Sequence, residues 1–131
     1  MDAPVFRHSN RVTFADTDAS GWMHFTKFFR FVEEAEHAFL REVGVPVFDR
    51  SQVGWPRVNV ACDFLKPLAF GEEVDTRLAI LRLGNSSITW GFEIRKTASG
   101  EIYARGSMTS VLVDGDGKTR VIPTEYRDVL G

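Results

Sequence analysis

The stretch TKFFRFVEEAEHAFLREVG, residues 26–44, decides the fold of this chain. Its apolar side chains recur at steps of three and four residues, which predicts an amphipathic helix with one broad apolar face. Thr26 is the expected N-cap, because its hydroxyl accepts a bond from a free first-turn N–H, and Gly44 is the expected stop. A helix with so wide an apolar face requires a sheet to cover it. That face comprises Phe28, Phe31, Val32, Ala35, Ala38, Phe39 and Val43.

Most of the remaining chain alternates apolar and polar residues, as strands with one buried face do. Short turn signals separate these runs, among them Asp-Gly pairs at 114–117 and the segment 84–86. We therefore predict an α+β fold in which one curved antiparallel sheet wraps around the long central helix. The expected strands are 10–15, 57–65, 73–83, 87–96 and 102–113, with a short return at 119–122 and a terminal helix at 123–130.

The composition indicates a single globular domain over residues 1–131. Sixteen Lys and Arg oppose eighteen Asp and Glu, a net charge of −2 that argues against a nucleic-acid partner. No apolar run approaches the ~20 residues that span a bilayer, and no signal-peptide pattern begins the chain, so we expect a cytoplasmic protein without a membrane partner. The single cysteine, Cys62, excludes an internal disulfide and a CxxC metal site.

A loop with two carboxylates, Asp16 and Asp18, precedes the helix in the sequence FADTDASGWMHF, residues 14–25. A calcium loop of the EF-hand type fits poorly, because Lys27 stands where a bidentate Glu is required. An aspartyl phosphatase needs crossover helices that this chain lacks. Two interpretations remain. The carboxylates shape the turn, or one of them acts in catalysis beside the free N–H groups of the helix start.

The segment DTDASGWMHF at 16–25, followed by FFRF at 28–31 and EEA at 33–35, resembles the 4-hydroxybenzoyl-CoA thioesterase family of hotdog-fold enzymes. The resemblance continues through CDF at 62–64 and FGE at 70–72. It implies a hotdog fold and a homodimer, or a dimer of dimers, with active sites at the dimer interface. It also implies hydrolysis of an acyl-CoA or acyl-carrier thioester to the free acid and thiol, without metal or cofactor.

The resemblance places the catalytic carboxylate on Asp18, which either attacks the thioester carbon or activates a water. The oxyanion donors fall at the helix start, on the backbone N–H of Phe25 and of His24. Asp16 is expected to form the turn. Glu34 is the fallback, because other hotdog thioesterases carry their carboxylate on the helix.

An acyl pocket is expected beside this loop, although phenylalanines at helical spacing also serve as plain core. Two other functions stay open: a hotdog hydratase or dehydratase, and a non-catalytic protein that binds an acyl or aromatic ligand. Related enzymes carry basic residues in the hairpin at 84–86, where this chain has Gly-Asn-Ser, so their nucleotide-binding site is not carried over. The expected substrate-binding residues are Gly21, Trp22, Met23, Phe28 and Phe29, and loose candidates for phosphate contacts are Arg57, Lys66, Arg82 and Arg105.

Overall fold

Five strands and one long helix make up most of the protein, whose computed structural model describes residues 5–49 and 53–131. In chain order the elements are β1 (Phe6–Arg11), the 3-10 helix η1 (Phe14–Asp16), α1 (Phe25–Val43), β2 (Arg57–Phe64), β3 (Glu73–Leu83), β4 (Ser87–Lys96), β5 (Ile102–Val111) and α2 (Thr124–Leu130). No helix in this described part is long and apolar enough to cross a membrane.

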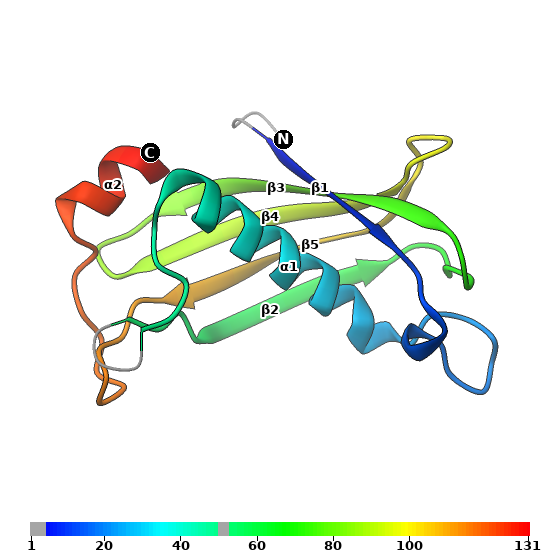
Figure 1. Ribbon diagram of the computed structural model, residues 1–131, viewed down its shortest axis with the longest axis horizontal. Coiled ribbons are helices and arrows are strands. Elements are labelled where there is room, and N and C mark those ends of the chain that lie inside the picture. The colour runs from blue at the N-terminus through cyan, green and yellow to red at the C-terminus, as the bar shows by residue number, and fades with distance from the viewer. Residues whose placement is uncertain (1–4, 50–52) are drawn as a thin grey trace.

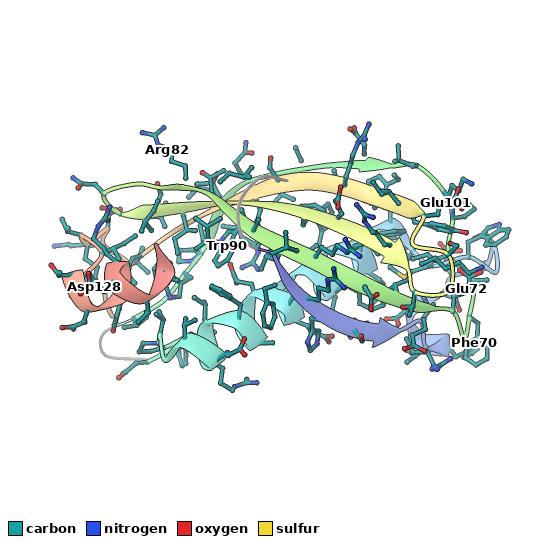
Figure 2. The ribbon with its side chains drawn as sticks, turned by 90° about the horizontal axis from the view of Figure 1, so that it is seen from above. Phe70, Glu72, Arg82, Trp90, Glu101 and Asp128 are labelled. Atoms are coloured by element: carbon teal, nitrogen blue, oxygen red, sulfur yellow. The ribbon has the colours of Figure 1, made fainter. Side chains whose placement is uncertain are left out.

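The strands form one antiparallel sheet in the order β1-β3-β4-β5-β2. The helix α1 lies across one face of this sheet (Figure 1), and the view from above shows the strands curving along it (Figure 2). This arrangement confirms the predicted α+β class with a sheet wrapped around a central helix. β3 and β4 begin and end where the alternation of the sequence places them.

The helix α1 buries the apolar face that its spacing predicts. Phe31 and Ala35 are fully buried, Phe28 and Val32 are nearly so, and Ala38, Phe39 and Val43 are partly buried. Gly44 ends the helix at a φ of 80°, in the left-handed region that favours glycine, and its N–H donates to the carbonyls of Leu40 and Arg41. The expected stop is therefore confirmed.

Three local predictions are wrong. The first strand covers 6–11 rather than 10–15, because Asp16 accepts a bond from the Thr13 backbone N–H and turns the chain into η1. The N-cap of α1 is His24, whose Nδ1 accepts from the N–H of Thr26, so Thr26 is already helical. Residues 119–122 form a single bridge from Thr119 to Val113 instead of a strand.

The two edges of the sheet differ in character. β1 carries polar side chains between partly buried ones, whereas β2 exposes apolar side chains over much of its length. Val58, Val60 and Phe64 are 62%, 41% and 43% exposed. In the described part of the chain β2 pairs with β5 alone, so its outer edge is open to a further strand.

Candidate active site

Asp18 begins a tight turn between η1 and α1. Its carbonyl accepts from the N–H of Gly21 at 3.0 Å, and its own N–H donates to the carbonyl of Trp22 at 3.1 Å. A bridge between Thr17 and Met23 closes the base of this loop. Gly21 has a φ of 86°, a conformation that favours glycine. The loop therefore holds Asp18 beside the residues that lead directly into α1.

The carboxylate of Asp18 is exposed and ionised. Its Oδ1 accepts from the Ser20 hydroxyl and from the Ser20 backbone N–H, the latter at 2.8 Å. These hydrogen bonds, with a smaller contribution from the charge of His24, lower the pKa of Asp18 below its usual 3.8. At neutral pH the carboxyl group is therefore an anion, the form in which it acts as a nucleophile or a general base. Ser20 holds one of its two oxygens.

Asp16 is buried and serves the structure of the turn. Its Oδ2 accepts from the N–H and the hydroxyl of Thr13, and its Oδ1 pairs with Arg30 at 2.6 Å. Burial disfavours its charge, but the bonds from Thr13 and Arg30 outweigh that penalty and lower its pKa. Asp16 thus forms the turn, as the sequence predicts, and ties it to the first turns of α1.

The start of α1 presents a free backbone donor. The N–H of His24 donates to the carbonyl of Asp16 at 2.8 Å, and the N–H of Thr26 donates to His24 Nδ1. Phe25 is the first residue of α1, and its N–H meets no acceptor in the described ranges 5–49 and 53–131. Because the positive end of the helix dipole lies here, this N–H is suited to an oxyanion or a polarised carbonyl.

A cavity of about 240 Å³ adjoins this helix start. Phe64, which ends β2, packs edge-on against three rings of α1, with its centroid 5.1 Å from that of Phe28 and 6.1 Å from those of Phe25 and Phe29. The cavity is thus an aromatic pocket that joins the start of α1 to the open edge of the sheet. Its lining consists of Met23, Phe25, Phe28, Phe64, Leu65, Lys66 and Pro67.

The structure brings some of the expected substrate-binding residues together and separates others. Met23 and Phe28 line the pocket, whereas Phe29 touches it only through the ring of Phe64. Trp22 lies at the surface and bridges to Ala69, away from the pocket lining, and Gly21 shapes the loop without lining the pocket. Phe64 was missed as a site residue, although its place in the alternation of 57–65 and in the CDF motif was a usable signal.

Three of the other charged candidates have partners within the fold. Glu34 bonds to Arg30 and to the side chain of Asn10, so its carboxylate is engaged. Arg57 pairs with the buried Glu36 at 3.0 Å, and Lys66 pairs with Glu101 at the pocket rim. No group of three or more His, Cys, Asp and Glu in the described part of the chain is placed to hold a metal ion.

Comparison with known proteins adds four findings. A family model described as the thioesterase-like superfamily matches residues 12–130. A relative from Aquifex aeolicus (strain VF5), whose name assigns no substrate, is 31% identical over 127 residues, covering 95% of this chain and 97% of that protein. A 1,4-dihydroxy-2-naphthoyl-CoA hydrolase from Synechococcus sp. (strain CC9605) is 28% identical, with 90% and 83% covered. The solved structure of a gentisyl-coenzyme A thioesterase matches with a TM-score of 0.87 at 29% identity, covering 95% and 99% of the chains.

Proposed function

This chain belongs to the thioesterase-like superfamily and is a thioester hydrolase, and from that premise we propose that Asp18 is its catalytic carboxylate. The resemblance noted in the sequence holds at the level of this superfamily, while membership of the 4-hydroxybenzoyl-CoA thioesterase family within it stays a prediction. One observation carries the proposal. The loop that leads into α1 carries an ionised Asp18, close enough to His24 for that side chain to affect its pKa, and the first residue of α1, Phe25, offers a free N–H and lines an apolar pocket.

In the proposed reaction Asp18 either attacks the thioester carbonyl carbon or removes a proton from the water that attacks it. Both routes place negative charge on the carbonyl oxygen, then break the C–S bond. The products are the free acid and the CoA thiol, with one water consumed. Phe25 donates its N–H to the charged oxygen, a contribution of about 3–4 kcal/mol per donor in other enzymes. The N–H of His24 is engaged with Asp16, so the proposal rests on Phe25.

We infer an aromatic acyl group from the aromatic lining of the pocket. Aromatic rings favour edge-to-face neighbours, and Phe25, Phe28 and Phe64 offer them. Relatives named for 1,4-dihydroxy-2-naphthoyl-CoA and gentisyl-CoA support this substrate class.

We also propose that two copies pair through β2. The outer edge of β2 is open, and its exposed Val58, Val60 and Phe64 would lose water-exposed apolar surface in an antiparallel pairing with a second β2. Since Phe64 also lines the pocket, such a partner would lie directly beside the proposed active site. This supports a site completed at a dimer interface.

The test is thiol release from a panel of CoA thioesters with benzoyl, 4-hydroxybenzoyl, gentisyl, 1,4-dihydroxy-2-naphthoyl, butyryl and palmitoyl groups. The proposal predicts the highest kcat/KM for an aromatic member. Preference for palmitoyl-CoA would contradict the inferred acyl class. Binding of the whole panel without turnover would overturn the proposed reaction in favour of a binding protein. Loss of enoyl absorbance from crotonyl-CoA would instead reveal a hydratase.

A further inference from the structure

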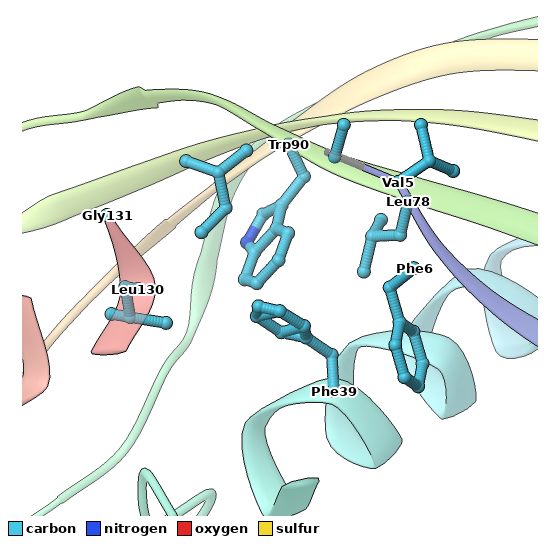
Figure 3. Close-up of a pocket in the computed structure, with 9 residues that line it drawn as sticks. Val5, Phe6, Phe39, Leu78, Trp90, Leu130 and Gly131 are labelled. Carbon is cyan, nitrogen blue, oxygen red and sulfur yellow. The ribbon is translucent and has the colours of Figure 1, made fainter. Parts of the chain in front are cut away.

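A second cavity, of about 350 Å³, lies between the C-terminal half of α1, the short helix α2 and strands β1, β3 and β4. Figure 3 shows Phe39 of α1, Phe6 of β1, Trp90 of β4 and Leu130 of α2 arranged around it. At a rise of ~1.5 Å per residue, Phe39 lies about 21 Å along α1 from Phe25. This cavity is therefore separate from the proposed active site.

The walls of the cavity are apolar and rich in aromatic rings. Phe39 packs edge-on against Phe6, with centroids 5.5 Å apart, and against Trp90, with centroids 5.7 Å apart. The lining that the structure describes includes aliphatic residues of β3 and α2 and no charged side chain. Because burial of an unpaired charge is costly, such a space favours a neutral ligand over an acid or an amine.

Trp90 supplies one polar group at this cavity. The side chain is 1% exposed, and its Nε1 is buried without a hydrogen-bond partner among the described residues. Trp55, by contrast, is also buried but donates its Nε1–H to the carbonyl of Pro46 at 3.0 Å. Leaving a buried donor without an acceptor is destabilising, and buried indoles usually find an acceptor. Trp90 is thus a donor that lacks its acceptor.

The short helix α2 lies on the side of the cavity that the Trp90 nitrogen faces. In Figure 3 the nitrogen-bearing edge of the Trp90 indole faces toward Leu130. α2 has only seven residues and is tied to the sheet through Arg127, which donates to the carbonyls of Gly84 at 2.8 Å and Leu83 at 3.5 Å. Because Nε1 is buried, a ligand acceptor reaches it only when a neighbouring side chain moves, and Leu130 is the labelled side chain that this edge faces.

We propose that this cavity is a second binding site, for a compact neutral carbonyl compound whose oxygen accepts a hydrogen bond from Trp90 Nε1. The rest of such a ligand packs against Phe39, Phe6 and the aliphatic wall. The cavity volume falls within the ~300–1,000 Å³ of small-molecule sites. The proposal does not depend on Asp18 or on the thioester reaction.

The experiment follows the three indole N–H resonances of the ¹⁵N-labelled protein during titration with 2-acetonaphthone, a neutral ketone. The Trp90 resonance is identified by its absence in Trp90→Phe. We expect a downfield shift of the Trp90 indole proton. The hydrocarbon of similar shape, 2-isopropylnaphthalene, should bind about 10-fold more weakly because it has no acceptor. The anion 2-naphthoate should bind more weakly still.

Variants of α2 and of the active site keep the test sharp if Trp90→Phe does not fold. Leu130→Ala shortens the side chain that the indole nitrogen faces in Figure 3 and should tighten binding of the ketone. Val129→Ala, a change to an exposed neighbour on the same helix, should leave binding unchanged. Asp18→Asn should bind the ketone as the wild type does. Three results would overturn the proposal: no shift at Trp90, a shift only at Trp22 or Trp55, or equal affinity for ketone and hydrocarbon.

Discussion

The backbone N–H of His24 donates to the carbonyl of Asp16 at 2.8 Å, and this bond decides which donor of the helix start is free. The N–H of His24 is thereby occupied. Phe25 is the first residue of α1, and its N–H has no acceptor among the described residues. The same bond closes the loop that carries Asp18 at the point where the loop enters α1. The proposed nucleophile or base and the proposed oxyanion donor are therefore positioned by one short segment, 16–25.

Phe25→Pro removes the proposed oxyanion donor and leaves the helix intact. Proline is well tolerated at the first helical position, and His24 already has the extended ψ of 138° that a residue before proline adopts. We expect kcat to fall by about 10²–10³ while the circular dichroism spectrum is unchanged. Steady-state thiol release gives the rate.

Phe25→Ala is the matched control for that variant, because it keeps the N–H and removes the ring. The ring lines the acyl pocket, so the expected effect is a raised KM with kcat nearly preserved. If Phe25→Pro retained wild-type kcat, the N–H of Phe25 would not be the oxyanion donor.

Asp16→Asn should destabilise the protein, because Asp16 is buried and satisfies Thr13 and Arg30. Arg30 is 37% exposed, so we expect a loss of about 1–3 kcal/mol in the free energy of unfolding rather than the larger value of a fully buried pair. The pKa of Asp16 is lowered in the folded state, so its stabilisation is present above the unfolded value and is lost as pH falls through the folded one. Urea unfolding at pH 7 and at pH 3 should show the difference between wild type and variant shrinking at the lower pH. A difference that stayed constant would refute the ionic role of Asp16.

Glu36 should make stability fall with rising pH. It is 1% exposed, and burial raises its pKa above the usual 4.5 although Arg57, His37 and Ser110 favour its charge. The unfolded chain therefore releases this proton first, so the wild type loses stability as pH rises from 4.5 through the folded pKa. Glu36→Gln has no carboxyl proton to lose. The free energy of unfolding of the wild type minus that of the variant should therefore decrease as pH rises from 4.5 through the folded pKa of Glu36. A difference that increases with pH there would contradict the raised pKa.

Val60→Lys should prevent pairing through β2. The side chain lies on the open edge strand, where a charge opposes strand addition. Sedimentation velocity should give the mass of a dimer, or of a dimer of dimers, for the wild type and of a monomer for the variant. Val121→Lys, at an exposed site outside β2, is the control and should assemble like the wild type. A dimeric Val60→Lys protein would place the interface elsewhere.

The sequence predicts the bounds of an element best where buried residues recur at regular spacing along it. The α1 stripe and the alternation of β3 and β4 each reflect a continuous contact with the core, so their positions are read correctly. β1 has no apolar alternation, because it is an edge strand with polar outward side chains. Val12 and Phe14 imitate a strand, yet Asp16 bends the chain at that point and leaves Phe14 79% exposed.

Only part of the candidate active site can be predicted from the sequence, because some of its residues are far apart along the chain. The acidic loop and the helix start are adjacent in sequence, so their association was predicted. Phe64, however, reaches Phe25 and Phe28 across more than thirty residues, and only the folded sheet brings β2 beside α1. The backbone hydrogen bond from the His24 N–H to the Asp16 carbonyl also depends on the folded shape of the loop, and no periodicity in the sequence predicts it.

The most direct test of the proposed mechanism is the single-turnover rate of thiol release from the best aromatic acyl-CoA, for wild type and Asp18→Asn. The exposed Asp116→Asn serves as control, and unfolding free energies verify that all three proteins are folded. We predict a fall of at least about 100-fold for Asp18→Asn, with Asp116→Asn and the stability of both variants unchanged. Wild-type turnover in Asp18→Asn would contradict the assignment and direct the search to Glu34.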